Sequence, residues 1–345
     1  MKKKKIFLGA YVNQLNAQNI NCKSISLHLN KEKYQVKSLV LGSKNVPKLD
    51  GVSYFRVSSL CYSFSNLIAF IRAVLWADVC YLPKHQSTPR IVLKIASFFY
   101  KKIFTTIEGN MCDTSKKNMI NSFGSINNMI QYFSLIPNKF GITKEIVENA
   151  KCGVFLNSDP LYLGVEKIKF NYNKPRKKLR NVVFIGSLVK TKDIDEFIRL
   201  SSYFPEISFN VVGDGPERKR LKSISGHNVI FHNKLNHECL SKLLKDMDLH
   251  FLPSKSEGFP KVVLETASSA IPSIVYKDYG AIEWIIHKEN GFIVSNFNEV
   301  LDILHELIKR PDLLERNSQN VLELADKFDW KIVIKDWEKV IDNLI

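Results

Sequence analysis

The chain has 345 residues, of which 45% are hydrophobic and 24% are charged, and its formal net charge is +16 at pH 7. The length favours two domains over one, and the composition excludes a long disordered or low-complexity protein. The charge favours anionic small substrates or an acidic membrane surface as partners. Nucleic acid ranks last, because no helix-turn-helix, zinc-finger or RNA-binding signature accompanies the charge.

The six cysteines are scattered, with no C-x-x-C pair and no His-Cys cluster at metal-ligand spacing. We therefore expect reduced, mostly buried thiols in a cytoplasmic protein. The basic start of the chain precedes only a short apolar run, which indicates a first strand rather than a signal peptide. The longest apolar passage, residues 67–82, is interrupted by Arg72 and Asp78. A transmembrane helix is not expected, and the protein should be soluble or membrane-associated.

Short apolar runs in the first half are predicted strands, with helices between several of them. The runs are residues 5–12, 34–42, 51–57, 78–83, 102–109 and 152–158. A basic stretch without apolar periodicity, residues 173–180, is the predicted linker. We expect one α/β domain over residues 1–172 and a second over residues 181–328.

The second half alternates regularly between strands and helices. Strands are expected over residues 181–188, 208–215, 228–235, 249–254 and 291–294, with a further helix and strand within residues 256–275. Helices are expected over residues 193–203, from Pro216, and over residues 237–247, 300–310 and 311–327. This alternation indicates parallel strands joined by right-handed crossovers, a doubly wound α/β domain. Residues 329–345 form an amphipathic terminal helix that either closes the second domain or crosses back to the first.

Ligands of an open parallel sheet bind beyond the carboxyl ends of its strands. Lys190 and Lys192 follow the strand at residues 181–188 and open a helix, a place that favours an anion, although solvated surface lysines would fit equally. After the next strand, Gly213, Asp214 and Gly215 allow a tight turn and a close backbone approach to a ligand. A plain β-α turn would use the same residues.

Two carboxylates, Glu257 and Glu265, stand in an apolar strand-helix-strand passage of a basic chain. Carboxylates pair well with the vicinal hydroxyls of a sugar or ribose, because each accepts two hydrogen bonds. The alternatives are a helix-capping role for Glu257 and, for Glu265, an ion pair with Lys261 four residues before it.

The sequence EGFPKVVLE, residues 257–265, resembles the donor-site signature of the retaining glycosyltransferases of family 4, which have the GT-B fold. The motifs GSLVKTKD and GDGPER before it and FDWKIV after it fall in the order that this family shows. The resemblance covers residue 181 onward and is thin in the first half. It implies two Rossmann-like doubly wound domains facing each other across a cleft, with the acceptor in the first domain. It also implies a terminal helix that crosses back to that domain.

The resemblance also implies roles for individual residues. Glu257 would contact the sugar of a nucleotide-sugar donor, Glu265 would bind the ribose hydroxyls, and Lys192 would face the diphosphate and stabilise the leaving nucleotide. Such enzymes are thought to need neither a protein nucleophile nor a metal, so no cofactor is expected. Further donor contacts are expected from the backbone of Gly258, Phe259 and Pro260, and from Ser187, Lys190, Gly213, Asp214, Gly215 and Lys234, the last in the loop of residues 232–235 where the base would lie.

The chain departs from the family pattern at two positions. Ser187 stands where an arginine is usual, so phosphate neutralisation would rest more heavily on Lys192. Glu108 stands where a histidine is usual, at the end of a first-domain strand. Glu108 would orient the acceptor or act as a base, unless it is an ordinary loop acid.

We therefore expect a cytoplasmic transferase that moves a sugar to a glycan or polyprenyl-diphosphate-linked acceptor in bacterial surface polysaccharide synthesis. The rivals are a catalytically idle nucleotide-sugar-binding scaffold and, more weakly, a GT-B epimerase or phosphorylase. Residues 89–104 mix basic with aromatic and aliphatic residues. They form either a helix that lies on an anionic bilayer, with the protein peripheral on the inner face of the membrane, or a helix packed on the sheet with lysines at its rim.

Overall fold

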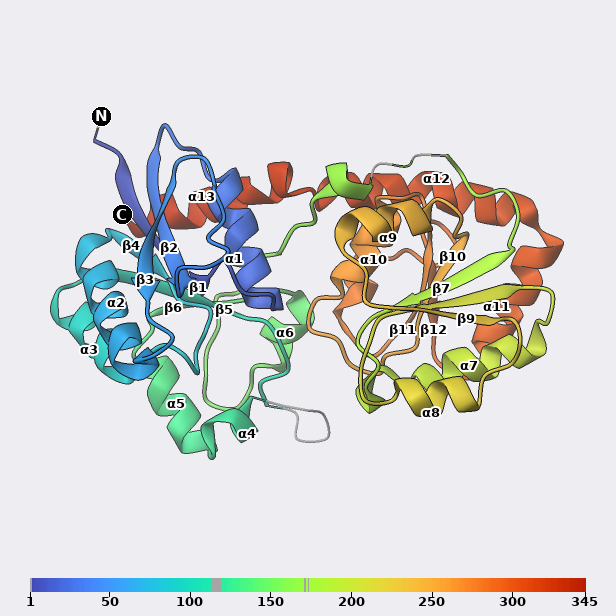
Figure 1. Cartoon of the computed structure of the whole chain (residues 1–345), viewed down its shortest axis with the longest axis horizontal. Coiled ribbons are helices and arrows are strands. Elements are labelled where there is room, and N and C mark those ends of the chain that lie inside the picture. Colours follow the sequence, from blue (N-terminus) through green and yellow to red (C-terminus); the bar gives the residue numbers. More distant parts are fainter. Residues whose placement is uncertain (1, 113–118, 171, 173) are drawn as a thin grey trace. The chain divides into compact units, whose positions relative to one another are not determined.

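The computed structural model describes residues 2–112, 119–170, 172 and 174–345, and the chain divides into two compact units (Figure 1). Unit 1 comprises Met1–Gly164 and Trp330–Ile345, and unit 2 comprises Val165–Asp329. The first boundary therefore falls after Gly164, earlier than the predicted end of the first domain at residue 172. The chain returns to unit 1 at residue 330.

Unit 1 contains a six-stranded parallel sheet of order β3-β2-β1-β4-β5-β6. The central strands are almost entirely buried apolar residues, as expected for a sheet covered by helices on both faces. The elements are β1 (Lys4–Tyr11), α1 (Ala17–His28), β2 (Tyr34–Leu41), β3 (Val52–Val57), α2 (Tyr62–Trp76), β4 (Val79–Tyr81), α3 (Arg90–Phe98), β5 (Lys102–Ile107), α4 (Ile120–Phe123), α5 (Ile126–Ser134), β6 (Asn138–Gly141), α6 (Lys144–Asn149) and α13 (Trp330–Leu344).

The terminal helix α13 supplies part of the core of unit 1. Trp330 and Trp337 are fully buried. The indole nitrogen of Trp337 donates to the carbonyl oxygen of Tyr162 at 2.9 Å, and its ring packs edge-on against Tyr81 with centroids 5.0 Å apart. Unit 1 is therefore completed by a helix that follows the whole of unit 2 in the sequence.

The predicted strand at residues 152–158 is wrong. The last strand of the sheet is β6, which pairs with β5, and residues 152–158 lie in irregular structure. The apolar pattern misled because Phe155 is 84% exposed and contributes nothing to a buried strand face. Asn157 does donate a backbone hydrogen bond to Lys139, at 2.7 Å, so the segment touches β6 without forming a ladder.

The expectation of reduced, mostly buried cysteines is also wrong. Cys112 and Cys152 form a disulfide across a sequence separation of 40 residues. Of the free thiols, Cys22 and Cys80 are buried, whereas Cys61 and Cys239 are exposed. No local spacing signalled the bond, because the fold alone brings the loops after β5 and α6 together.

Unit 2 repeats the strand order of unit 1. Its six-stranded parallel sheet runs β12-β11-β10-β7-β8-β9, so the first strand lies beside the fourth in both units. This confirms the predicted alternation of the second half. The elements are η1 (Lys167–Phe170), β7 (Asn181–Ile185), η2 (Lys190–Lys192), α7 (Ile194–Tyr203), β8 (Ser208–Val212), α8 (Arg218–Ser223), β9 (Val229–His232), α9 (His237–Leu244), β10 (Leu249–Leu252), α10 (Lys261–Ala267), β11 (Ser273–Tyr276), η3 (Gly280–Glu283), β12 (Phe292–Val294), α11 (Phe297–Lys309) and α12 (Pro311–Lys327).

The predicted linker is residues 173–180. Asn173 is outside the described residues, and residues 174–180 lie inside unit 2. Arg176 is 6% exposed, and its guanidinium donates to the backbone oxygens of Leu244, Lys245 and Ser269 at 2.6 to 2.9 Å. Buried N–H groups need acceptors, and these carbonyls supply them to the two terminal nitrogens of the guanidinium. The segment is therefore a structural part of unit 2.

Candidate functional site

A cavity of about 540 Å³ opens at the carboxyl ends of β7, β8 and β9 in unit 2. This is the edge of a doubly wound sheet at which ligands bind. Several residues predicted as donor contacts line the cavity, while Lys190, Lys192, Glu257 and residues 258–260 are outside its lining. The lining residues are Ile185, Gly186, Ser187, Val212, Gly213, Asp214, Gly215, Lys234, Leu235, His237, Leu240 and Glu265.

The glycines after β8 are required by the neighbouring loop. A Cβ on Gly213 would lie 1.8 Å from the carbonyl oxygen of Gly186, and one on Gly215 would lie 2.4 Å from that of Leu188. Gly213 also has a φ of 147°, which other residues rarely adopt. The close backbone approach inferred from the sequence is thus an approach between the loops after β7 and β8, which brings both to the cavity.

Arg218 ties the loops that line the cavity, a role that the sequence reading missed. Its guanidinium donates at 2.8 Å to the carbonyl oxygens of Gly213 and His232, and at 3.0 Å to the side chain of Asn233. Its place at the end of the GDGPER motif was the available signal. The helix α8 begins at Arg218, two residues later than the predicted start at Pro216.

Glu265 reaches the cavity from α10. Its side chain is 16% exposed, and its Oε1 lies 3.8 Å from Nε2 of His237 at the start of α9. Burial raises the pKa of the Glu265 carboxyl, while Lys261 and Lys169 partly oppose that rise. His237 was not predicted as a site residue, because it lies at the start of the helix that follows the predicted base-binding loop of residues 232–235. The carboxylate and the imidazole together present acceptors and a donor to hydroxyl groups.

Lys192 and Glu257 form an ion pair, with side chains 25% and 12% exposed. Beside it, Asp193 pairs with Lys255 at 2.7 Å. The first residue of each pair follows β7 and the second follows β10, neighbouring strands at the point where the strand order reverses. The two pairs therefore join the loops of the switch point of unit 2.

The turn Gly258-Phe259-Pro260 lies between Glu257 and α10. The ring of Phe259 packs against Trp284 with centroids 4.6 Å apart, and less closely against Phe328 at 6.1 Å. Pro260 occupies the N-cap position of α10. The capping role considered for Glu257 is therefore wrong.

Glu108 belongs to unit 1, where it follows β5. Its carboxylate accepts hydrogen bonds from Asn21 Nδ2 at 3.4 Å and from Thr106 Oγ1 at 3.5 Å. Thr106 in turn lies 2.6 Å from the hydroxyl of the buried Tyr81. Burial chiefly, and the charge of Glu108, raise the pKa of that phenol well above its usual value.

Comparison with known families matches residues 165–323 to the model for glycosyl transferases group 1. An uncharacterized glycosyltransferase of Haemophilus influenzae is 26% identical over 186 residues, which cover 49% of this chain and 50% of the relative. The alpha-galactosylglucosyldiacylglycerol synthase of Streptococcus pneumoniae is 28% identical over 165 residues, 45% of this chain and 44% of the relative. The matched part thus spans about half the length of these curated relatives.

Among solved structures, the Anabaena protein Alr3699/HepE in complex with UDP superimposes with a TM-score of 0.76 at 15% identity. The superposition covers 99% of this chain and 100% of that one. At 15% identity, this similarity is evidence for the fold alone. The two six-stranded parallel sheets and this neighbour give the fold as the two-domain α/β arrangement called GT-B.

Proposed function

We propose that the chain is a retaining glycosyltransferase that takes its sugar from a nucleotide-sugar donor, because residues 165–323 match the model for glycosyl transferases group 1. The acceptor is a glycan or a polyprenyl-diphosphate-linked glycan in the synthesis of a bacterial surface polysaccharide. The relative of S. pneumoniae named as a glycolipid synthase supports a lipid-linked acceptor.

One observation carries this proposal: the cavity at the ends of β7 to β9 holds Glu265, and the Lys192–Glu257 pair stands at the switch point of the same sheet. Glu265 accepts from the ribose hydroxyls. The backbone N–H groups of the loops after β7 and β8 lie close to the phosphates. Lys192 neutralises charge on the departing diphosphate, and Glu257, already beside that lysine, binds hydroxyls of the transferred sugar.

Catalysis then rests on positioning and on charge neutralisation. The acceptor hydroxyl attacks the anomeric carbon on the face from which the nucleotide leaves, its proton passes to the departing phosphate oxygen, and the nucleotide is released. Ser187 supplies a hydroxyl where the family pattern has an arginine. Glu108 orients the acceptor hydroxyl or, in place of the phosphate oxygen, takes its proton. Glu108→Gln should then slow turnover of the true acceptor without weakening donor binding. Unchanged turnover would remove Glu108 from the reaction.

The experiment is thermal unfolding of the purified protein with a panel of UDP-, GDP- and dTDP-sugars. A ligand that binds only the folded state raises stability by RT ln(1 + [L]/Kd), so the panel also identifies the donor. Lys192→Ala and Glu265→Ala should lose the shift, whereas Lys190→Ala, which removes a more exposed lysine two residues before the one paired with Glu257, should keep most of it. No shift with any nucleotide-sugar would contradict the proposal. Donor binding without transfer to any acceptor would favour the idle scaffold, the rival that Ser187 and Glu108 support.

A second part of the proposal places unit 1 at an anionic membrane surface. The helix α3 buries Val92, Leu93 and Ala96, as the packed-helix alternative predicted. Its C-terminal end nevertheless carries three exposed aromatic side chains: Phe98 is 77% exposed, Phe99 52% and Tyr100 90%. Lys94 and Lys102 are exposed in the same segment. Exposed aromatics among lysines complement the interface of a bilayer that contains anionic lipids.

Sedimentation with phosphatidylglycerol vesicles tests this part. Binding should fall as salt rises and should weaken in Phe98→Ser and Tyr100→Ser. Tyr203→Ser, which removes a 49% exposed aromatic from unit 2, should bind as the parent does. Binding that ignores ionic strength, or none at all, would contradict it. Among the described residues, no helix has the length and apolarity that a bilayer crossing requires.

A further inference from the structure

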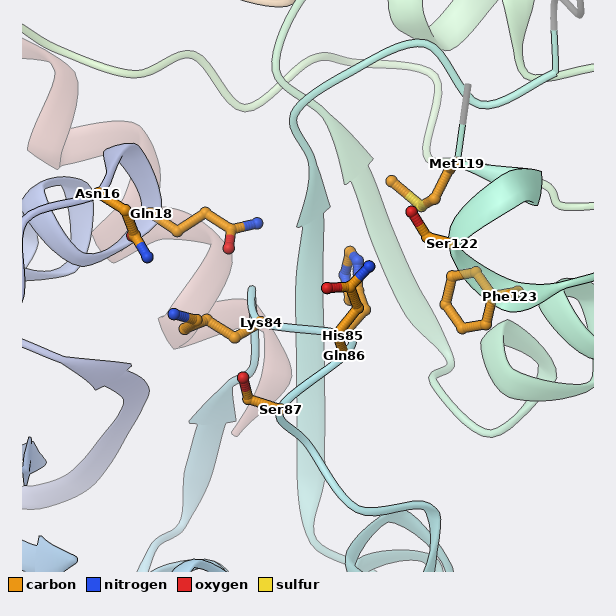
Figure 2. A pocket seen from close by; sticks show the side chains of 9 residues that line it. All are labelled: Asn16, Gln18, Lys84, His85, Gln86, Ser87, Met119, Ser122 and Phe123. Atoms are coloured by element: carbon orange, nitrogen blue, oxygen red, sulfur yellow. The ribbon is translucent and has the colours of Figure 1, made fainter. Parts of the chain in front are cut away.

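Unit 1 has a cavity of about 350 Å³ at its own switch point. Because β1 lies beside β4, the loops that follow these strands meet where the strand order of unit 1 reverses, as the loops after β7 and β10 do in unit 2. Figure 2 shows Asn16 and Gln18 on one side, residues 84–87 in the middle, and Met119, Ser122 and Phe123 on the other side. The sequence did not predict this cavity, because three segments far apart in the chain form it.

The lining is rich in groups that bind hydroxyls. Amide side chains come from Asn16, Gln18 and Gln86, and hydroxyls from Ser87 and Ser122. The Gln18 amide donates to the carbonyl oxygen of Pro83 at 3.0 Å, which fixes it at the rim. Such a set can donate to and accept from several hydroxyls of one small polar ligand.

Lys84 is the cationic side chain of this lining. Its ammonium lies 3.5 Å from Asn19 Oδ1 and 5.6 Å from the centroid of the Tyr11 ring. Partial burial lowers the pKa of Lys84. Among the described residues, no ion pair within 4.0 Å includes this lysine, so amide and ring contacts hold its charge without neutralising it. An anionic ligand would supply the missing charge.

The two aromatic rings of the lining have different roles. His85 is 8% exposed and bonds Thr105 Oγ1 at 2.7 Å, and burial lowers its pKa to about 3, so the imidazole is neutral at physiological pH. Phe123 packs its ring against Tyr132 and Phe133, with centroids 5.2 and 5.6 Å away. A ring held in this way offers a flat apolar surface to the C–H groups of a sugar.

We infer that this cavity binds an anionic sugar residue of the acceptor, a uronate or a sugar phosphate, whose charge is met by Lys84. The amides and hydroxyls contact the hydroxyls of that sugar, and Phe123 packs against its ring. The volume is near the lower end of the range of about 300–1,000 Å³ for small-molecule sites, which suits a single sugar residue better than a nucleotide-sugar. That the bound sugar belongs to the acceptor rests on the proposed glycosyltransferase function, whereas the binding of an anionic sugar does not.

The test is an NMR titration of the intact protein with methyl glucuronide, glucose 6-phosphate and neutral methyl glucoside. At least one anionic sugar should bind roughly 10- to 100-fold more tightly than the glucoside, as expected for a charge-assisted hydrogen bond. Lys84→Met should remove that advantage and leave the glucoside affinity within about twofold, while Lys84→Arg should keep most of it. Whichever anionic sugar binds more tightly identifies carboxylate or phosphate as the charge recognised.

Lys48→Met is the matched control, since it removes the same charge from an exposed site outside the lining. An equal loss in Lys48→Met, an anionic preference that survives Lys84→Met, or no preference for either anionic sugar would overturn the inference. So would the absence of binding by all three sugars. The nucleotide-sugar panel, measured on the same samples, reports on the donor site of unit 2. The two proposals can therefore fail separately.

Discussion

The two units share one strand order but differ in how the lysine at the switch point is held: by a carboxylate in unit 2, and by amides and a ring in unit 1. In unit 2 the lysine after β7 is neutralised by a glutamate after β10, and a second pair lies beside it. In unit 1 the lysine after β4 is surrounded by amides and a ring instead. The scaffold therefore sets where a ligand binds, and the loop residues set which charge it must carry.

The loops that follow strands also differ between the two units, and a pair of glycine substitutions measures that difference. Gly213→Ala in unit 2 places a Cβ against the Gly186 carbonyl at an unfavourable φ, and should cost roughly 3 kcal/mol or more of unfolding free energy. In unit 1, Gly109→Ala meets nothing within 4 Å and should change stability by less than about 0.5 kcal/mol. Chemical denaturation of both variants checks this, and equal losses would contradict it.

A pair of lysine substitutions compares the two charge arrangements directly. Lys192→Met leaves Glu257 largely buried without its partner, and should lower the unfolding free energy by about 1–2 kcal/mol after allowance for partial exposure. Lys84→Met removes a half-buried charge that is paired with no carboxylate in the described part of the chain, so unit 1 should be unchanged or slightly more stable. Urea denaturation gives both values. If Lys84→Met proved the more costly change, the contrast between the units would be wrong.

The smallest expected effect is pH-dependent and concerns Glu265. Because burial raises its pKa in the folded state, the native protein holds this proton to higher pH than the unfolded chain does. The carboxyl therefore lowers the unfolding free energy as pH rises through and above its ordinary range near pH 4.5. Glu265→Gln should match the parent at pH 3 and be slightly more stable at pH 7, although it binds nucleotide more weakly. Melting curves of parent and variant from pH 3 to pH 7 check this. A variant that loses stability relative to the parent as pH rises would contradict it.

The sequence was most informative where structure repeats locally. The short apolar runs and amphipathic helices of unit 2 predicted its β/α alternation, and the start of α10 after Pro260 follows from proline's preference for the beginning of a helix. Edge strand β6 was missed, since its four residues include polar Asn138 and Lys139. A four-residue strand with mixed polarity has no periodicity that separates it from a loop.

The site could be predicted only as a set of candidates. Glu257, Glu265 and Lys192 were predicted as site residues because each stands in a recognisable motif on the carboxyl side of a predicted strand. The ion pair between Lys192 and Glu257 was not predicted, since these two residues are 65 positions apart in the chain. Arg176 was interpreted as part of a linker because a basic run looks the same whether its arginine is solvated or bonded to buried carbonyls. Such contacts depend on how the chain closes in three dimensions.

The assignment of α13 to unit 1 has a consequence for synthesis on the ribosome. All of unit 2 is available to fold before Trp330 and Trp337 emerge, whereas unit 1 waits with an incomplete core until these tryptophans arrive. The half that is made first is therefore finished last. In the interval, the surface that these two indoles will cover is open to chaperones and to aggregation.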